Sequence, residues 1–306
     1  MMSEIHGSDV GVDIQSYSRL RDLATQQTRD GLLDQARSGF AAALAIAERS
    51  GSAALVDRAF CNLAGVEIEL GGAPETMPAS LRQILVENRD SECCRLAAYH
   101  LSRYYELRKQ GKKALFYARI AKERSRLLDH SYWLGSSGNQ VAMLLLSESR
   151  LDEASRELEV ALGHVPEDEG VAKALMMENL AYCRFLQGRM NDGFRLCFQS
   201  LRQLRKLGRR WWHPELTLTY GYLQINRGGR ALRHGRSALA SAEAAGEVQA
   251  VKNALFLLGE AANQVGDAET AYDYFARLQR EHYPDQPFLP SFLLAVDVTG
   301  LVNLKA

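Results

Sequence analysis

Residues 252–285 read KNALFLLGEAANQVGDAETAYDYFARLQREHYPD, with small and apolar residues at helical spacing on both sides of Gly266. In the second half, Ala271, Phe275 and Leu278 are separated by four and then three positions, which places them on one face of a helix. A glycine between the halves suits a helix end that needs a left-handed residue. The stretch therefore predicts a helix–turn–helix unit.

The same four-then-three spacing returns along most of the chain. The triplets are Ala36, Phe40 and Ala43; Ala114, Ala118 and Ala121; Ala154, Leu158 and Ala161; Gly193, Cys197 and Ser200; Ala231, Gly235 and Ala238; and Ala271, Phe275 and Leu278. Their first members lie 38 to 40 residues apart, except for a first interval of 78, which places a degenerate copy near Pro78. A fixed period of this kind indicates a solenoid of repeated units. We place seven units, beginning near residues 17, 57, 95, 135, 174, 214 and 252, and the fold class is all-α.

Glycines punctuate the repeats. Gly71, Gly111, Gly188, Gly228 and Gly266 each precede a segment that carries, or should carry, a triplet, and we expect them to end the preceding helices. The small triplet residues are expected to let the two helices of a unit approach closely, so that an enlarged side chain there overpacks the pair.

Composition limits the possible functions. The 306 residues carry no net charge and are 46% hydrophobic, which argues against bulk attraction to nucleic acid or an anionic membrane. No apolar run reaches the roughly 18 residues of a membrane span. Five cysteines, an odd number with no Cys-x-x-Cys pair, favour a reduced, cytoplasmic location. Residues 1–13, rich in Gly, Ser and Asp, are expected to form a flexible tail.

The clearest units, residues 135–166 and 252–285, resemble the tetratricopeptide repeat (TPR). Leu258-Gly259 in the first helix, Ala271 and Phe275 in the second, and the closing Pro284 carry the resemblance, which spans roughly residues 17–285. Because the TPR period is about 34 residues, the longer period here is similar to that of the long-repeat branch found in bacterial signalling regulators, quorum-peptide receptors and kinesin light chains. The resemblance implies a right-handed superhelical array over residues 14–285 that serves as a protein-binding scaffold.

The C-terminal residues 286–306 leave the repeat pattern. They are apolar and read as one last helix from about Ser291, which is expected to cap the exposed end of the array. Two alternatives are equally simple: this tail continues the array, or it docks a second copy of the chain in a homodimer.

The resemblance implies that the first helices of the units line an inner groove. One position per unit then reads Asp22, Asn62, His100, Gln140, Asn179, Thr219 and Leu257. Most of these side chains both donate and accept hydrogen bonds, so we expect them to hold the backbone of an extended peptide. The alternative is that they face solvent in an unused groove, because Asn-Leu-Ala at Asn62 and Asn179 is close to the ordinary TPR pattern. The peptide-binding role also requires that the chain's own tail does not fill the groove.

Neighbouring positions complete the predicted groove. The register turns further side chains inward: Tyr99, Arg103, Asn139, Met143, Glu178, Tyr182, Tyr222, Phe256, Glu260 and Asn263. Tyr and Arg dominate binding energy at interfaces, so Tyr99, Arg103, Tyr182 and Tyr222 are the anchor candidates. Packing between successive first helices is an equally simple role for each of them.

Charge is segregated along the chain despite the zero total. Residues 189–236 hold eleven bases and two acids. The candidate basic strip comprises Arg202, Lys206, Arg209, Arg210, Arg230 and Arg233. Such a strip could attract nucleic acid or a phosphorylated or acidic partner, but a solvated outer helix face is the simpler interpretation, and nucleic acid is not the expected partner.

No phosphate loop, dinucleotide fingerprint, zinc spacing or nucleophile elbow occurs in the sequence. We therefore predict a non-enzymatic module without cofactor or metal that binds a peptide segment or helix of a protein partner in its groove. The alternatives are the basic strip just described and a peptide-sensing regulator similar to the quorum receptors.

Overall fold

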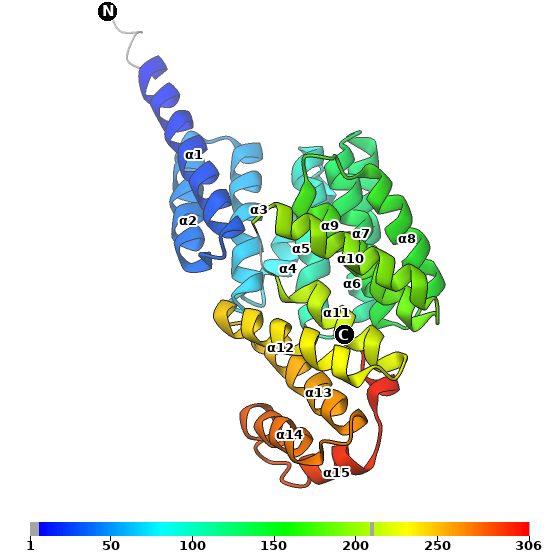
Figure 1. Ribbon diagram of the computed structural model, residues 1–306. Helices are drawn as coiled ribbons and strands as arrows, with labels where there is room; N and C mark the ends of the chain where they lie inside the picture. The colour runs from blue at the N-terminus through cyan, green and yellow to red at the C-terminus, as the bar shows by residue number, and fades with distance from the viewer. Residues whose placement is uncertain (1–5, 209–210, 306) are drawn as a thin grey trace, which may run out of the picture. The chain divides into compact units, whose positions relative to one another are not determined.

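The computed structural model describes residues 6–208 and 211–305, and these ranges contain helices and no strand (Figure 1). Successive helices form seven pairs. The pairs are α1 (His6–Arg29) with α2 (Leu33–Ser50), α3 (Ala53–Glu69) with α4 (Met77–Glu87), α5 (Ser91–Leu107) with α6 (Gly111–Leu127), α7 (Ser131–Ser147) with α8 (Leu151–His164), α9 (Gly170–Leu186) with α10 (Met190–Lys206), α11 (Trp212–Gln224) with α12 (Gly228–Ala245), and α13 (Val248–Gln264) with α14 (Ala268–His282). The predicted all-α array of helix–turn–helix units is confirmed.

The chain divides into two compact units, Met1–Ser137 and Gly138–Ala306. The first contains α1 to α6 and the start of α7, and the second contains the remaining helices. Within each unit, neighbouring helices pack in sequence order, as in the pairs α1 with α2 and α5 with α6, and α9 with α10 and α13 with α14.

The seams between paired helices are built from the triplets. All eighteen triplet residues are buried, from Ala36 in α2 to Leu278 in α14. The close approach that small residues permit is measurable at Gly193, where an added Cβ would lie 2.4 Å from Cε1 of Phe185 in α9. Any larger side chain there must push Phe185 aside, so the small residue is a packing requirement.

The turn inside each pair places one residue in the left-handed region. These residues are Gly31, Gly71, Lys109, Ser149, Gly188, Asn226 and Gly266, which lie 38 to 40 positions apart. Gly71, Gly188 and Gly266 behave as predicted. The expectation was wrong for Gly111 and Gly228, which begin α6 and α12, because Lys109 and Asn226 take the left-handed conformation two residues earlier.

Helix starts follow the predicted units closely after the first. The helices α3, α5, α7, α9 and α13 each begin four residues before the expected position, whereas α1 begins at His6 within the stretch expected to be a flexible tail. Residues 1–5 of that stretch lie outside the described part of the chain. The degenerate copy near Pro78 forms α4, with Pro78 in its first turn, where a missing N–H costs no helical hydrogen bond.

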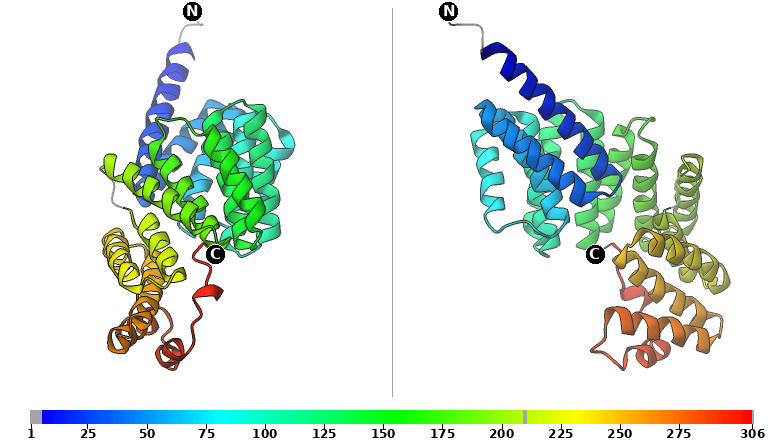
Figure 2. Two further views of the ribbon diagram at one scale, coloured as in Figure 1. Left: turned by 45° about the vertical axis from the view of Figure 1, so that its right-hand side comes forward. Right: turned by 90° about the vertical axis from the view of Figure 1, so that its left-hand side faces the viewer.

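The C-terminal stretch differs from the single helix expected from Ser291. It forms the short α15 (Leu289–Ala295), which packs against α14 and α13, and then the 3₁₀ turn η1 (Thr299–Leu301). From there to Lys305 the chain is not helical, and Figure 2 shows it leaving α15 and running back toward earlier helices of the second unit. Residues 297–305 are called the tail below.

Candidate functional site

The tail lies against polar side chains of the first helices of the second unit. Glu178 and Tyr182 of α9 and Asn253 of α13 contact its end, and Glu260 of α13 contacts its start. Together with Asn263 of α13, these five residues define the tail groove. The α13 members are spaced by seven and three residues, so one face of that helix supplies them.

Leu304 of the tail is held through its backbone. Its N–H donates to the Tyr182 hydroxyl at 3.0 Å, and its carbonyl accepts from the Asn253 side-chain amide at 3.2 Å. The neighbouring Asn303 donates to the carbonyl of Leu146 in α7 at 3.3 Å. Because the bonds to Leu304 use only its main-chain groups, this part of the groove can hold a peptide main chain regardless of the side chain, here in a turn at residues 304–305.

Glu178 forms a buried ion pair with the tail. Its carboxylate is 1% exposed, accepts from the Lys305 ammonium at 2.8 Å, and also accepts from the Thr217 hydroxyl of α11. Burial opposes the charged form, but the Lys305 ammonium and the hydrogen bonds outweigh it and hold the pKa of Glu178 below its usual value. The groove therefore presents a fixed negative charge at the tail's end.

A second anchor lies at the start of the tail. The Thr299 hydroxyl donates to Oε2 of Glu260 at 3.3 Å, while Oε1 of Glu260 is buried with no hydrogen-bond partner among the described residues. Burial and the nearby Asp297 raise the pKa of Glu260 to about 7. In addition, Asn263 donates to the carbonyl of Leu294 at 3.2 Å, at the end of α15.

A cavity of about 400 Å³ adjoins the end of the tail. Asn139 of α7 and Asn179 of α9 line it, and the two are joined by a hydrogen bond of 3.0 Å between their side-chain amides. His213 lines the same cavity, and burial followed by the Lys305 charge lowers its pKa to about 4. The cavity continues the tail groove along the first helices, and Asn139 and Asn179 add uncharged donors and acceptors to it.

The peptide-binding role was expected to require a groove that the chain's own tail does not fill. The tail groove does not meet this requirement, because the tail fills it at Glu178 and Tyr182. The cavity beside the end of the tail is open. An unobstructed groove in the second unit is therefore not what the structure contains.

Two predicted groove residues of the first unit, His100 and Arg103, contact the neighbouring first helix. The His100 ring of α5 packs so closely on Gly65 of α3 that an added Cβ would lie 2.5 Å from its Cε1. Burial, followed by the charge of Arg95, lowers the pKa of His100 to about 4. Arg103 is paired with Glu69 of α3 at 2.9 Å and with Glu106 at 2.6 Å. Asn62 and Tyr99 are half-buried in α3 and α5.

Three predicted residues of the second unit do not line the tail groove or its cavity. Gln140 is buried in α7. Thr219 is fully buried, and its hydroxyl donates to the Glu215 carbonyl one turn earlier. Tyr222 stacks on His234 of α12 with ring centroids 5.4 Å apart and also meets Phe194. Tyr222 therefore packs against aromatic side chains of α10 and α12.

The basic strip is exposed where it is described. Arg202 and Lys206 lie on the exposed side of α10, Arg230 and Arg233 lie on that of α12, and Arg209 and Arg210 lie outside the described residues. Arg230 rests over the Tyr222 ring.

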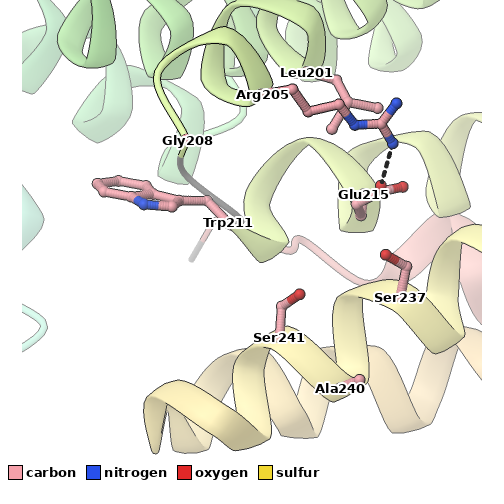
Figure 3. A pocket seen from close by; sticks show the side chains of 8 residues that line it. All are labelled: Leu201, Arg205, Gly208, Trp211, Glu215, Ser237, Ala240 and Ser241. Carbon is pink, nitrogen blue, oxygen red and sulfur yellow. Dashed lines mark hydrogen bonds and ion pairs between the residues drawn. The ribbon is translucent and has the colours of Figure 1, made fainter.

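A hollow of about 550 Å³ lies near these residues, between α10, the start of α11 and α12. Figure 3 shows Arg205 reaching Glu215 at 3.4 Å, with Trp211 beside the hollow and Ser237 and Ser241 on α12. Arg205 in this hollow is thus paired with an acid, as the interpretation of the strip as a solvated helix face predicts.

Sequence reasoning missed Asn253, Thr217 and the tail itself. A signal for Asn253 was present, because it lies one helical turn before Leu257 of the predicted register. No repeat pattern covers the tail, so its path carried no such signal.

Two further searches of the described residues bear on function. No group of three or more His, Cys, Asp or Glu side chains in them could hold a metal ion. Over the same ranges, none of the helices combines the length and apolar character needed to cross a membrane.

Comparisons with known proteins show the fold. No protein-family profile matches the chain, and neither does any curated protein. Among solved structures, a Rap protein complexed with Competence and Sporulation Factor is similar with a TM-score of 0.70 and 14% identity over 94% of this chain and 80% of that one. The apo form of RapI is similar with a TM-score of 0.65 and 12% identity over 87% of this chain and 76% of that one. A tetratricopeptide repeat protein from Parabacteroides merdae is similar with a TM-score of 0.56 and 15% identity over 94% of this chain and 100% of that one. The chain therefore has a long-repeat, TPR-like fold.

Proposed function

We propose that the chain is a non-enzymatic interaction module whose second unit binds an extended peptide segment of a protein partner along its first helices. The observation that carries this proposal is the binding of Leu304, whose main-chain N–H and carbonyl are both bonded by first-helix side chains. Side chains of this groove thus bond both main-chain groups of a residue, and the open cavity beside Asn139 and Asn179 extends the groove.

The similar structures support the same assignment. One of them is a Rap protein whose structure contains Competence and Sporulation Factor, and its likeness to this chain extends over most of both chains. We infer a signalling role in a bacterial cytoplasm, with the groove as the partner site.

A peptide selection tests the proposal. Random ten-residue peptides are displayed and selected on the full-length chain and on its Lys305→Gln variant, which lacks the tail's ammonium. We expect enriched peptides whose affinity falls about tenfold or more when Asn139 and Asn179 are both replaced by alanine, because two side-chain hydrogen bonds are lost.

The matched control is Asn191→Ala, which removes an exposed amide from α10 and should leave the affinity unchanged. Failure to enrich any peptide on either chain would refute the proposal, as would equal affinities for the double variant and the control.

The other functions inferred from the sequence stay predictions. Nothing in the described part of the basic strip gathers its bases around one hollow, so nucleic acid remains the less favoured partner. A peptide-sensing regulator remains compatible with the groove, and one similar structure is that of aspartyl phosphate phosphatase F from Bacillus subtilis. Docking of a second copy through the C-terminal stretch also remains a prediction.

A further inference from the structure

The tail makes the contacts that a bound peptide would make. Its backbone bonds to Tyr182 and Asn253, and its last described side chain, Lys305, pairs with Glu178. All three partners lie on first helices of the second unit. This part of the chain thus occupies the site proposed for the peptide.

The tail is held at two separate anchors with little regular structure between them. Glu260 holds Thr299 at one end, and Glu178 and Tyr182 hold residues 304 and 305 at the other. Val302, between the anchors, and Val298, just before the first anchor, line a small apolar hollow with Phe256 of α13. No helical ladder continues past η1, and residues 302–305 are only partly buried. Segments with few buried contacts open at low free energy, so the end of the tail can leave without unfolding the helices.

We propose that the tail is an internal competitor of the partner peptide, so that binding at the groove requires displacement of residues 303–305. The inference rests on the proposed function and deepens it, because it states how access to the same site is controlled. A displacing ligand must replace the Lys305 ammonium, since Glu178 would otherwise remain a buried carboxylate without a cation.

The first measurement follows the tail in the full-length chain by amide hydrogen exchange. The Leu304 N–H should exchange about tenfold or more slowly than in the free synthetic peptide of residues 297–306, because it donates to Tyr182. Lys305→Gln should remove most of this protection, whereas Lys305→Arg, which keeps the charge, should retain it.

The second measurement uses the labelled peptide of residues 297–306 as the probe. It is titrated into the full-length chain and into the full-length variant Leu304→Pro/Lys305→Gln, whose tail has lost both the N–H and the ammonium. Because the changes lie in the last three residues, the helices should be unaffected, which circular dichroism checks. We expect about tenfold or tighter binding to the variant, and weaker binding when the probe carries Gln in place of Lys305.

Three outcomes would overturn the inference: free-peptide exchange at Leu304 in the unaltered chain, equal probe affinity for both chains, or no binding of the probe to the variant. The proposed function is judged separately by the selected peptides. If those peptides bind while the probe shows no difference between the chains, competition by the tail is refuted and the groove assignment stands. If the probe behaves as expected while no selected peptide binds, the groove assignment fails.

Discussion

Glu260 should make the stability of the second unit depend on pH. Its buried carboxyl accepts one hydrogen bond from Thr299 and faces Asp297, and its pKa is raised from 4.5 to about 7. Between these two values the folded chain holds a proton that the unfolded chain has lost. Stability should therefore fall as the pH rises from about 4.5 to about 7. Asp297 is the only other titratable group among the described residues that line this hollow.

The size of the effect follows from the shift. A rise in the pKa of Glu260 from 4.5 to about 7 lowers the free energy of unfolding by at most ~3 kcal/mol, and this loss is complete above pH 7. Glu260→Gln keeps the shape and an acceptor for Thr299 but cannot ionise. At pH 8 the variant should be more stable than the unaltered chain by up to ~3 kcal/mol, and near pH 4.5 the two should be about equal.

Urea denaturation followed by circular dichroism at several pH values between 5 and 8 measures the difference. Asp297→Asn should give a smaller pH slope, because the neighbouring carboxylate is the second cause of the raised pKa. Parallel pH profiles for the unaltered chain and Glu260→Gln would show that Glu260 is not held protonated, and would refute the reasoning.

Three further results are expected. Gly193→Ala should destabilise the chain by ~1–3 kcal/mol through overpacking against Phe185. The control Gly229→Ala, with nothing near the added Cβ, should change stability by less than ~0.5 kcal/mol. Thermal denaturation of both variants checks this, and equal midpoints would contradict it. Lys109→Gly should stabilise the chain by ~1 kcal/mol, because a left-handed lysine is strained, and an unchanged urea midpoint would count against that strain. The pKa of His100 should be about 4 in an NMR titration of the ring, and a midpoint near 6.5 would mean that the ring is hydrated.

The seam residues of the repeats could be predicted from the sequence, because close helix packing restricts the side chains there. Ala114, Ala118 and Ala121 were identified from spacing alone, and each is 0% exposed. The turns were less predictable. Lys109 and Asn226 adopt the left-handed conformation without being glycine, since the turn geometry is imposed by the helices on both sides and the cost is only ~1–2 kcal/mol. The glycine pattern therefore identified the turns but not always the strained residue.

The candidate site was only partly accessible to sequence reasoning. The register turned Glu178, Tyr182, Glu260 and Asn263 inward, and all four contact the C-terminal stretch. Tyr222 belonged to the same register, yet it packs on His234, because an aromatic cluster at α10 to α12 buries more apolar surface than an exposed groove position would. The course of the tail depends on single hydrogen bonds to distant helices, and no periodic pattern encodes such contacts.

The two units differ in what their first helices do with polar side chains. In the first unit, Arg103 is already paired with Glu69 and Glu106, so its charge is used to join α3 and α5. In the second unit, Glu178 forms its ion pair with Lys305, which lies 127 positions away in the sequence. A charge whose counterion comes from a detachable segment can change partner without disturbing the helix packing, whereas a charge paired across two helices cannot. The second unit is therefore where the proposed peptide exchange is physically possible.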